Sequence, residues 1–145
     1  MKTALVINIL LFAAGLCGGQ TQDQQARKLA NKVSTAFFLG LQRLDRDHLV
    51  RGRLKVTIEN SGGEPEYEYK SFRSFGEMQR WMKSEENDEG VPWRESGQKL
   101  YCRKGLCTIG LVDGQMRHSH VFLTKMYYGY DKGRIFVRRL YIIYG

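Results

Sequence analysis

Residues 118–145 read HSHVFLTKMYYGYDKGRIFVRRLYIIYG, and this closing stretch decides the fold. It is rich in β-branched and aromatic residues, and Asp131, Lys132 and Gly133 interrupt it as a turn, so it predicts a long β-hairpin. A three-residue tip would place Tyr128 opposite Phe136 and leave both faces mostly apolar. Strands of this kind are covered on both sides or line a partly apolar pocket. We expect the pocket to be lined by Phe122, Met126, Tyr128, Phe136 and Leu140.

Further strands are predicted upstream. Apolar and polar residues alternate over 48–60, where Val56 and Ile58 point one way and Lys55 and Thr57 the other. The stretch EYEYKSF at 66–72 resumes an extended pattern. Two short strands, 98–102 and 107–112, flank a turn at residues 103–105, and a second turn at residues 113–114 leads into the closing hairpin.

Two helices are predicted as well. Residues 21–47 have apolar side chains at three- and four-residue spacing, and Thr21 with Gln24 forms a capping-box pattern. The apolar stripe comprises Ala26, Leu29, Ala30, Val33, Ala36, Phe37, Leu41 and Leu44. A shorter helix is expected to begin at Ser74 and to place Met78, Trp81 and Met82 on one face. Trp81 and Trp93 are expected to pack as core residues.

These elements predict an α+β fold in which a long N-terminal helix packs on a strongly curved antiparallel sheet, with one short second helix. The chain has 145 residues, enough for one domain. Residues 1–19 combine Lys2, an apolar run and small residues in the manner of a secretory signal peptide, so we expect a single extracellular domain over 20–145. No second long apolar segment follows, and we expect no transmembrane segment in the mature chain.

The chain carries a formal net charge of +8, which favours anionic partners. From Tyr101 onward there are eight basic residues and two acidic ones. Interleaved with tyrosines, these cations predict a sheet platform for a polyanion, although a merely solvated face would have the same composition. The anion-binding candidates are Arg103, Lys104, Arg117, Lys125, Arg134, Arg138 and Arg139.

Cys17 belongs to the predicted leader, which leaves Cys102 and Cys107 as an even pair. In an oxidising compartment such a pair is expected to form a disulfide. A loop this short contributes about 2 kcal/mol by loop-entropy arithmetic. A zinc site would need two further ligands, which only histidines could supply.

The histidines are weak candidates for chemistry. His118 and His120 would share one face of a strand and could ligate a metal, but a third ligand is not evident. A nuclease could use His48, His120 and Lys125 as acid, base and charge stabiliser, yet nothing in the sequence brings them together. We assign no metal, no cofactor and no catalytic residue.

The order of elements, closing with HVFLTKMYYGYDKGRIFVRRLYII, resembles the ketosteroid-isomerase-like, or nuclear-transport-factor-like, superfamily. That resemblance implies a curved sheet that wraps a helix into a cone, often holding a small molecule. The related cystatin roll is the nearest alternative, but its protease-blocking Gln-x-Val-x-Gly loop is absent. Enzymes of the superfamily pair an acidic base with a tyrosine, and no position here matches that motif.

The sequence therefore predicts a secreted, non-enzymatic binding domain that holds a small apolar ligand or a protein partner. The alternative is an extracellular polyanion-binding protein that uses the basic C-terminal strands, with a glycosaminoglycan, a lipid headgroup or nucleic acid as partner. A pocket enzyme or a secreted nuclease is a third interpretation. The oligomeric state is not fixed by these patterns.

Overall fold

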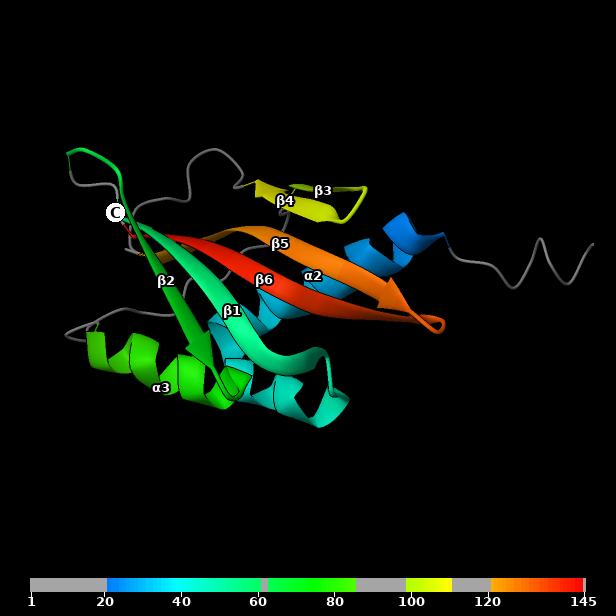
Figure 1. Ribbon diagram of the computed structural model, residues 1–145, viewed down its shortest axis with the longest axis horizontal. Helices are drawn as coiled ribbons and strands as arrows, with labels where there is room; N and C mark the ends of the chain where they lie inside the picture. Colours follow the sequence, from blue (N-terminus) through cyan, green and yellow to red (C-terminus); the bar gives the residue numbers. More distant parts are fainter. Residues whose placement is uncertain (1–20, 61–62, 86–98, 111–120, 145) are drawn as a thin grey trace, which may run out of the picture.

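The computed structural model describes residues 21–60, 63–85, 99–110 and 121–144 (Figure 1). The fold is α+β. Its elements in chain order are α2 (Gln22–Leu39), the 3₁₀ helix η1 (Leu41–Asp47), β1 (Val50–Asn60), β2 (Glu66–Phe72), α3 (Phe75–Glu85), β3 (Lys99–Arg103), β4 (Leu106–Gly110), β5 (Val121–Asp131) and β6 (Arg134–Tyr144). The predicted leader, Trp93 and the turn at residues 113–114 lie outside the described residues.

The sheet has six strands in the order β2-β1-β6-β5-β4-β3, so it is open, with β2 and β3 at its edges. β1 and β6 pair in parallel, whereas the other neighbours are antiparallel. The expectation of a purely antiparallel sheet is therefore wrong. After β2 the chain reaches the opposite edge at β3, and the meander from β3 to β6 then returns to the open side of β1. The last strand arrives there running in the same direction as β1.

Helix α2 begins as the sequence predicts. The Thr21 Oγ1 accepts a hydrogen bond from the Gln24 N–H at 3.2 Å, and the Gln24 side chain accepts one from the Thr21 N–H at 3.0 Å. These bonds satisfy backbone donors that have no partner inside the helix. The predicted extension of the helix through Leu44 is wrong. Gly40 adopts a φ of 127°, which ends α2 at Leu39, and Leu41 and Leu44 are buried from η1 instead.

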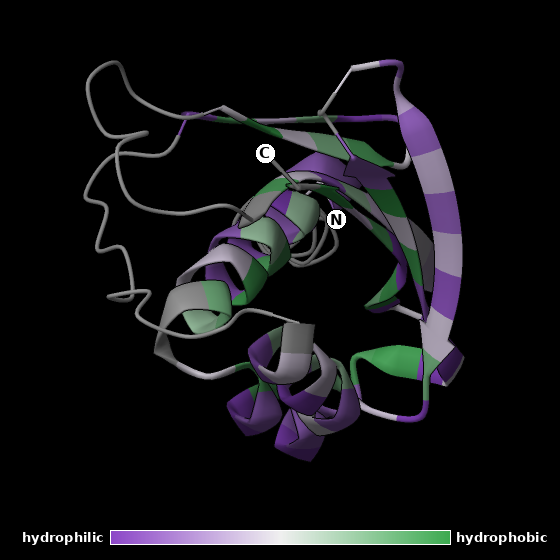
Figure 2. Cartoon of the chain, turned by 90° about the vertical axis from the view of Figure 1, so that its left-hand side faces the viewer, coloured by the Kyte–Doolittle hydropathy of each residue, from purple (hydrophilic) through white to green (hydrophobic). Residues whose placement is uncertain are grey.

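The apolar stripe of α2 packs into the bend of the sheet (Figure 2). Ala26, Ala30 and Val33 are fully buried, and the strands that lie beside α2 are β3, β4, β5 and β6. The sheet residues in this core include Leu54, Val56, Ile58, Leu123, Met126, Leu140 and Ile142. Three alanines on this stripe, Ala26, Ala30 and Ala36, are buried in the core, and their small side chains allow the helix backbone to approach the strands closely. Burial of this stripe is the main hydrophobic stabilisation of the fold.

The second helix, α3, starts where Ser74 predicts. The Ser74 hydroxyl accepts a hydrogen bond from the Glu77 N–H at 3.0 Å. The Asp45 carboxylate of η1 accepts two more, from the N–H groups of Phe75 at 2.8 Å and Gly76 at 3.0 Å. An anion at this end is favourable because the first N–H groups of a helix carry partial positive charge. Asp45 therefore fixes α3 against η1.

The β3–β4 and β5–β6 hairpins have the same kind of two-residue turn. Lys104 and Gly105 connect β3 to β4, Lys132 and Gly133 connect β5 to β6, and all four residues have positive φ. Positive φ at both central residues is typical of type I′ turns, whose twist matches the strands. The three-residue tips expected from the sequence are therefore wrong, because Asp131 already pairs with Arg134.

The shorter tip changes the register of the closing hairpin. Tyr128 pairs with Val137, and Phe136 lies opposite Gly129 instead of Tyr128. A Cβ atom at Gly129 would come within 2.3 Å of the Phe136 ring, so the ring occupies the space that a side chain would need. A bulge next to this pair leaves Arg138 without an opposite residue on β5.

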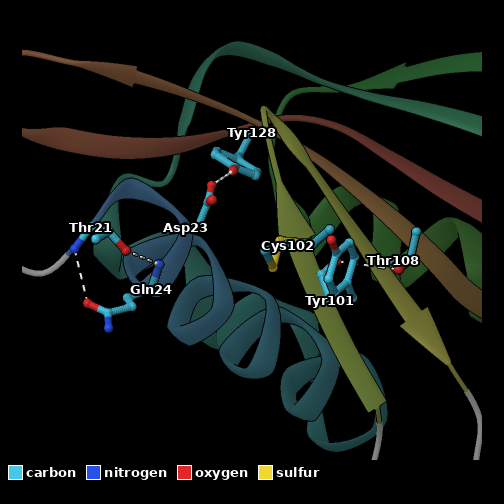
Figure 3. Close-up of a disulfide and its surroundings, with 8 residues drawn as sticks. Thr21, Asp23, Gln24, Tyr101, Cys102, Thr108 and Tyr128 are labelled. Atoms are coloured by element: carbon cyan, nitrogen blue, oxygen red, sulfur yellow. Dashed lines mark hydrogen bonds between the residues drawn. A yellow bond between two sulfur atoms is a disulfide. The ribbon is translucent and has the colours of Figure 1, made fainter.

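Cys102 and Cys107 form the predicted disulfide, with their sulfur atoms 2.07 Å apart. The two residues are directly opposite each other on β3 and β4. Cys107 is fully buried in the core beside α2, so the bond lies on the inner face of the sheet (Figure 3).

Candidate functional site

We call the face of the sheet turned away from α2 the outer face. Strand register aligns its side chains into two rows that each cross all six strands. The first row consists of Tyr69, Thr57, Tyr141, Lys125, Thr108 and Tyr101, and the second of Ser71, Lys55, Arg139, Tyr127, Leu106 and Arg103. With strands about 4.8 Å apart, each row is about 24 Å long.

Neither row contains an aspartate or a glutamate. The twelve side chains are four cations, four tyrosines and four small or apolar residues, and three of the cations lie in the second row. The rows therefore combine positive charge with aromatic rings. The tyrosines at the two ends of the first row, Tyr69 and Tyr101, are 71% and 63% exposed. Large aromatic side chains exposed to this extent are available to stack on a ligand.

Cation–ring contacts hold two of the cations along the face. The Lys125 Nζ lies 4.9 Å from the centre of the Tyr141 ring. The Arg139 guanidinium lies 5.9 Å from the centre of the Tyr69 ring and donates a hydrogen bond to the Thr57 Oγ1 at 2.8 Å. None of these partners carries a negative charge. The contacts therefore orient the two cations without neutralising them.

An open hollow of about 680 Å³ lies over the middle of the outer face. The first row contributes Tyr69 and Tyr141 to its lining and the second row Lys55 and Arg139. Lys104 and Arg138 add two further cations. A second hollow of about 490 Å³ lies beside the start of α2 and has Lys104 and Arg138 in its lining as well. The turn lysine and the bulged arginine thus extend the basic surface toward the edge of the sheet.

A carboxylate beside the first row already has a partner. Glu59, which follows the first row along β1, accepts a hydrogen bond from the Tyr141 hydroxyl. This bond, followed by burial, raises the pKa of Tyr141 well above its ordinary value of 10.0. The protonated phenol is a donor that holds the acidic side chain at the margin of the basic rows.

We expect Glu59→Gln to lower the pKa of Tyr141 toward 10.0, because the accepting carboxylate is lost. In the wild type, between about pH 10 and the raised pKa, the Tyr141 phenol is protonated in the folded state and ionised in the unfolded chain. The contact therefore stabilises the fold below about pH 10 and loses its effect as pH rises through the raised pKa. Alkaline titration of phenolate absorbance measures the shift, with Tyr141→Phe as the control that assigns the transition. An unchanged titration curve in Glu59→Gln would contradict the contact.

A second tyrosine joins α2 to the sheet. The Tyr128 hydroxyl donates a hydrogen bond to the Asp23 Oδ1 at 2.7 Å, which links the first turn of α2 to β5 (Figure 3). Burial raises the pKa of Tyr128, and Asp23 adds to the shift. Asp23 also lies in the first helical turn, where a carboxylate is favourable.

The structure divides the pocket candidates between two faces. Met126 and Leu140 form a pair on the inner face and are fully buried, and Tyr128 is 4% exposed. Phe136 instead lies under the guanidinium of Arg51, whose carbon is 4.5 Å from the ring centre. The side chain of Phe122 lies outside the described residues.

The structure brings most of the anion candidates together. Lys125, Arg139 and Arg103 belong to the two rows, and Lys104 and Arg138 line the hollows. Arg134 is set apart from the rows at the tip of the closing hairpin, where it is the residue opposite Asp131 in the strand register. Arg117, His118 and His120 lie outside the described residues, and so does any contact between His120 and His48.

The contribution of β1 and β2 to this face is not predicted by the sequence patterns. The alternation over residues 48–60 does predict that Lys55 and Thr57 share a polar strand face. What the pattern did not contain was the parallel pairing that sets Lys55 beside Arg139 and Thr57 beside Tyr141. Tyr69 joins the rows through its own pairing with Thr57.

Comparison with known proteins finds no matching family model, no matching curated protein and no matching solved structure. Within the described ranges, no group of three or more His, Cys, Asp or Glu side chains is placed to hold a metal ion. In the same part of the chain, no helix has the length and apolar character needed to cross a membrane.

Proposed function

We propose that this protein is a secreted, non-enzymatic binding protein whose outer face holds an extended polyanion, with an extracellular sulfated polysaccharide as the expected ligand. The observation that carries the proposal is the pair of cross-strand rows with four cations and no carboxylate. A chain lying across the strands along both rows would meet a cation on β1, β6, β5 and β3. Its rings would stack on tyrosines while its anionic groups face Lys55, Arg139, Lys125 and Arg103.

Packing on the inner face favours this proposal over an apolar ligand. Met126 and Leu140, two of the expected pocket residues, are fully buried in the same core as the α2 stripe. The hollow on the outer face includes lysine and arginine and no carboxylate among its lining residues, whereas the hollow beside the α2 start also includes Asp23. A ligand suited to such walls carries negative charge.

The extracellular location belongs to the proposal. It rests on the predicted leader at residues 1–19 and agrees with the disulfide between Cys102 and Cys107, since such bonds persist in oxidising compartments. The resemblance to the ketosteroid-isomerase-like superfamily, with its cone around a helix, likewise remains a prediction. A helix lying in the bend of a six-stranded sheet is compatible with it, but the proposed ligand site is on the opposite side of that sheet.

Nuclear magnetic resonance with a heparin-derived oligosaccharide tests the proposal. We expect ring resonances of Tyr69, Tyr127 and Tyr141 to shift during titration, because these side chains lie on the outer face. The methyl resonances of Leu140 should stay in place, because this side chain points to the opposite face. Shifts confined to Leu140 and its core neighbours would instead support the apolar-ligand interpretation and refute ours. A single-stranded oligonucleotide that bound more tightly than the saccharide would refute the ligand class.

A further inference from the structure

The edge strand β2 has one paired side and one open side. It is seven residues long, pairs with β1, and lies at the margin of the sheet in Figure 1. Among the described strands, none pairs with its other side. All of its residues up to Tyr69 are exposed, and no proline interrupts it. An edge of this kind presents backbone donors and acceptors that can pair with another strand.

The sequence of β2, EYEYKSF, is complementary to itself in antiparallel orientation. If two copies pair about a twofold axis at Tyr69, Lys70 of each copy lies opposite Glu68 of the other. The same register sets Tyr67 opposite the small Ser71 and Tyr69 opposite its own copy. Opposite charges and aromatic pairs directly across two strands are favourable. Within one chain, the Lys70 Nζ and the Glu68 Oε1 already lie 3.0 Å apart, and both side chains are partly exposed.

We propose that two copies of this chain associate through β2, with the pair of strands joining two sheets into one of twelve strands. The partner is a second copy because the segment Glu68–Tyr69–Lys70 is complementary in charge to an antiparallel copy of itself. A seven-residue strand pair buries little surface, so the dimer is weak and forms at high protein concentration. The two outer faces become continuous through Tyr69, which doubles the length of the first row.

Charge reversal at two positions tests the pairing. Lys70→Glu sets glutamates opposite each other twice in the dimer, and Glu68→Lys does the same with lysines. We expect each single variant to weaken self-association at least about tenfold, since like charges directly opposite repel. The double variant Glu68→Lys/Lys70→Glu restores the complementarity and should return association to near the wild-type strength. Lys28→Glu, on the exposed face of α2, is the control for Lys70→Glu, because it makes the same change of charge away from β2.

Sedimentation velocity over a range of protein concentrations, without any ligand, measures the association, and circular dichroism verifies that each variant is folded. A wild-type protein that stays monomeric at the highest attainable concentration overturns the proposal. So does a dimer that both single variants leave intact, or one that the double variant fails to restore. Because no polyanion is present, these outcomes are independent of the proposed ligand.

Discussion

Val33→Asp is expected to abolish cooperative folding. Val33 has no exposed surface and lies in the middle of the α2 stripe, in the same core as the inner-face residues of the sheet. An aspartate there would either bury an unpaired charge or expose the stripe. Either result costs about 4 kcal/mol or more, which is close to the whole stability of many domains of this size.

The control for this change is Thr35→Asp. Thr35 lies on the same helix two residues away, and its side chain is exposed, so the effect should stay within about 0.5 kcal/mol. Denaturant unfolding followed by circular dichroism compares the two variants with the wild type. If Val33→Asp unfolds cooperatively with less than about 1 kcal/mol of lost stability, α2 does not pack in the bend of the sheet.

The features that follow from local patterning were predictable. The helix stripe around Ala30 and Val33, the capping box at Thr21 and the start of α3 after Ser74 all come from residues within a few positions of one another. The disulfide was predictable because the mature chain was expected to keep only Cys102 and Cys107. In each of these cases the partners are near in sequence or have no competitors.

Features that depend on distant partners or on backbone conformation were not predictable. The run of apolar residues continued past Gly40, but the positive φ of that glycine ends α2. The two-residue tip at Lys132 requires positive φ for a lysine, which residue preference alone does not favour. That one shorter turn moved Phe136 away from Tyr128, because side chains alternate along a strand.

For the same reason, only part of the candidate site could be predicted from the sequence. Basic residues in β5 and β6 stood out from composition, whereas Lys55 and Tyr69 join them only because β1 lies beside β6. Strand order in a sheet is decided by how the whole chain packs. No pattern within β1 encodes its neighbour on that side, and the complete rows emerge only from the assembled sheet.

The largest loss of binding is expected from a variant with glutamine at all four row cations, Lys55, Arg103, Lys125 and Arg139. Four exposed charge contacts together contribute about 2–4 kcal/mol, so affinity for a heparin-derived oligosaccharide should fall on the order of 100-fold at physiological salt. The control variant replaces four exposed cations outside the outer face, Arg27, Lys28, Arg43 and Arg46, with glutamine. The control variant has the same net charge as the row variant, and its affinity for the oligosaccharide should fall by less than about threefold.

The most direct test of the outer face as the binding site is the salt dependence of oligosaccharide binding, measured for the wild type, the row variant and the control variant. Unfolding measurements first verify that the three proteins are equally stable. Each anionic contact releases about 0.7–0.9 counterion, so the slope of log affinity against log salt should become shallower by about 3 in the row variant. The control variant should keep the wild-type slope. Equal slopes for the row variant and the wild type, or a loss that appears equally in the control, would contradict the assignment of the polyanion site to the two rows.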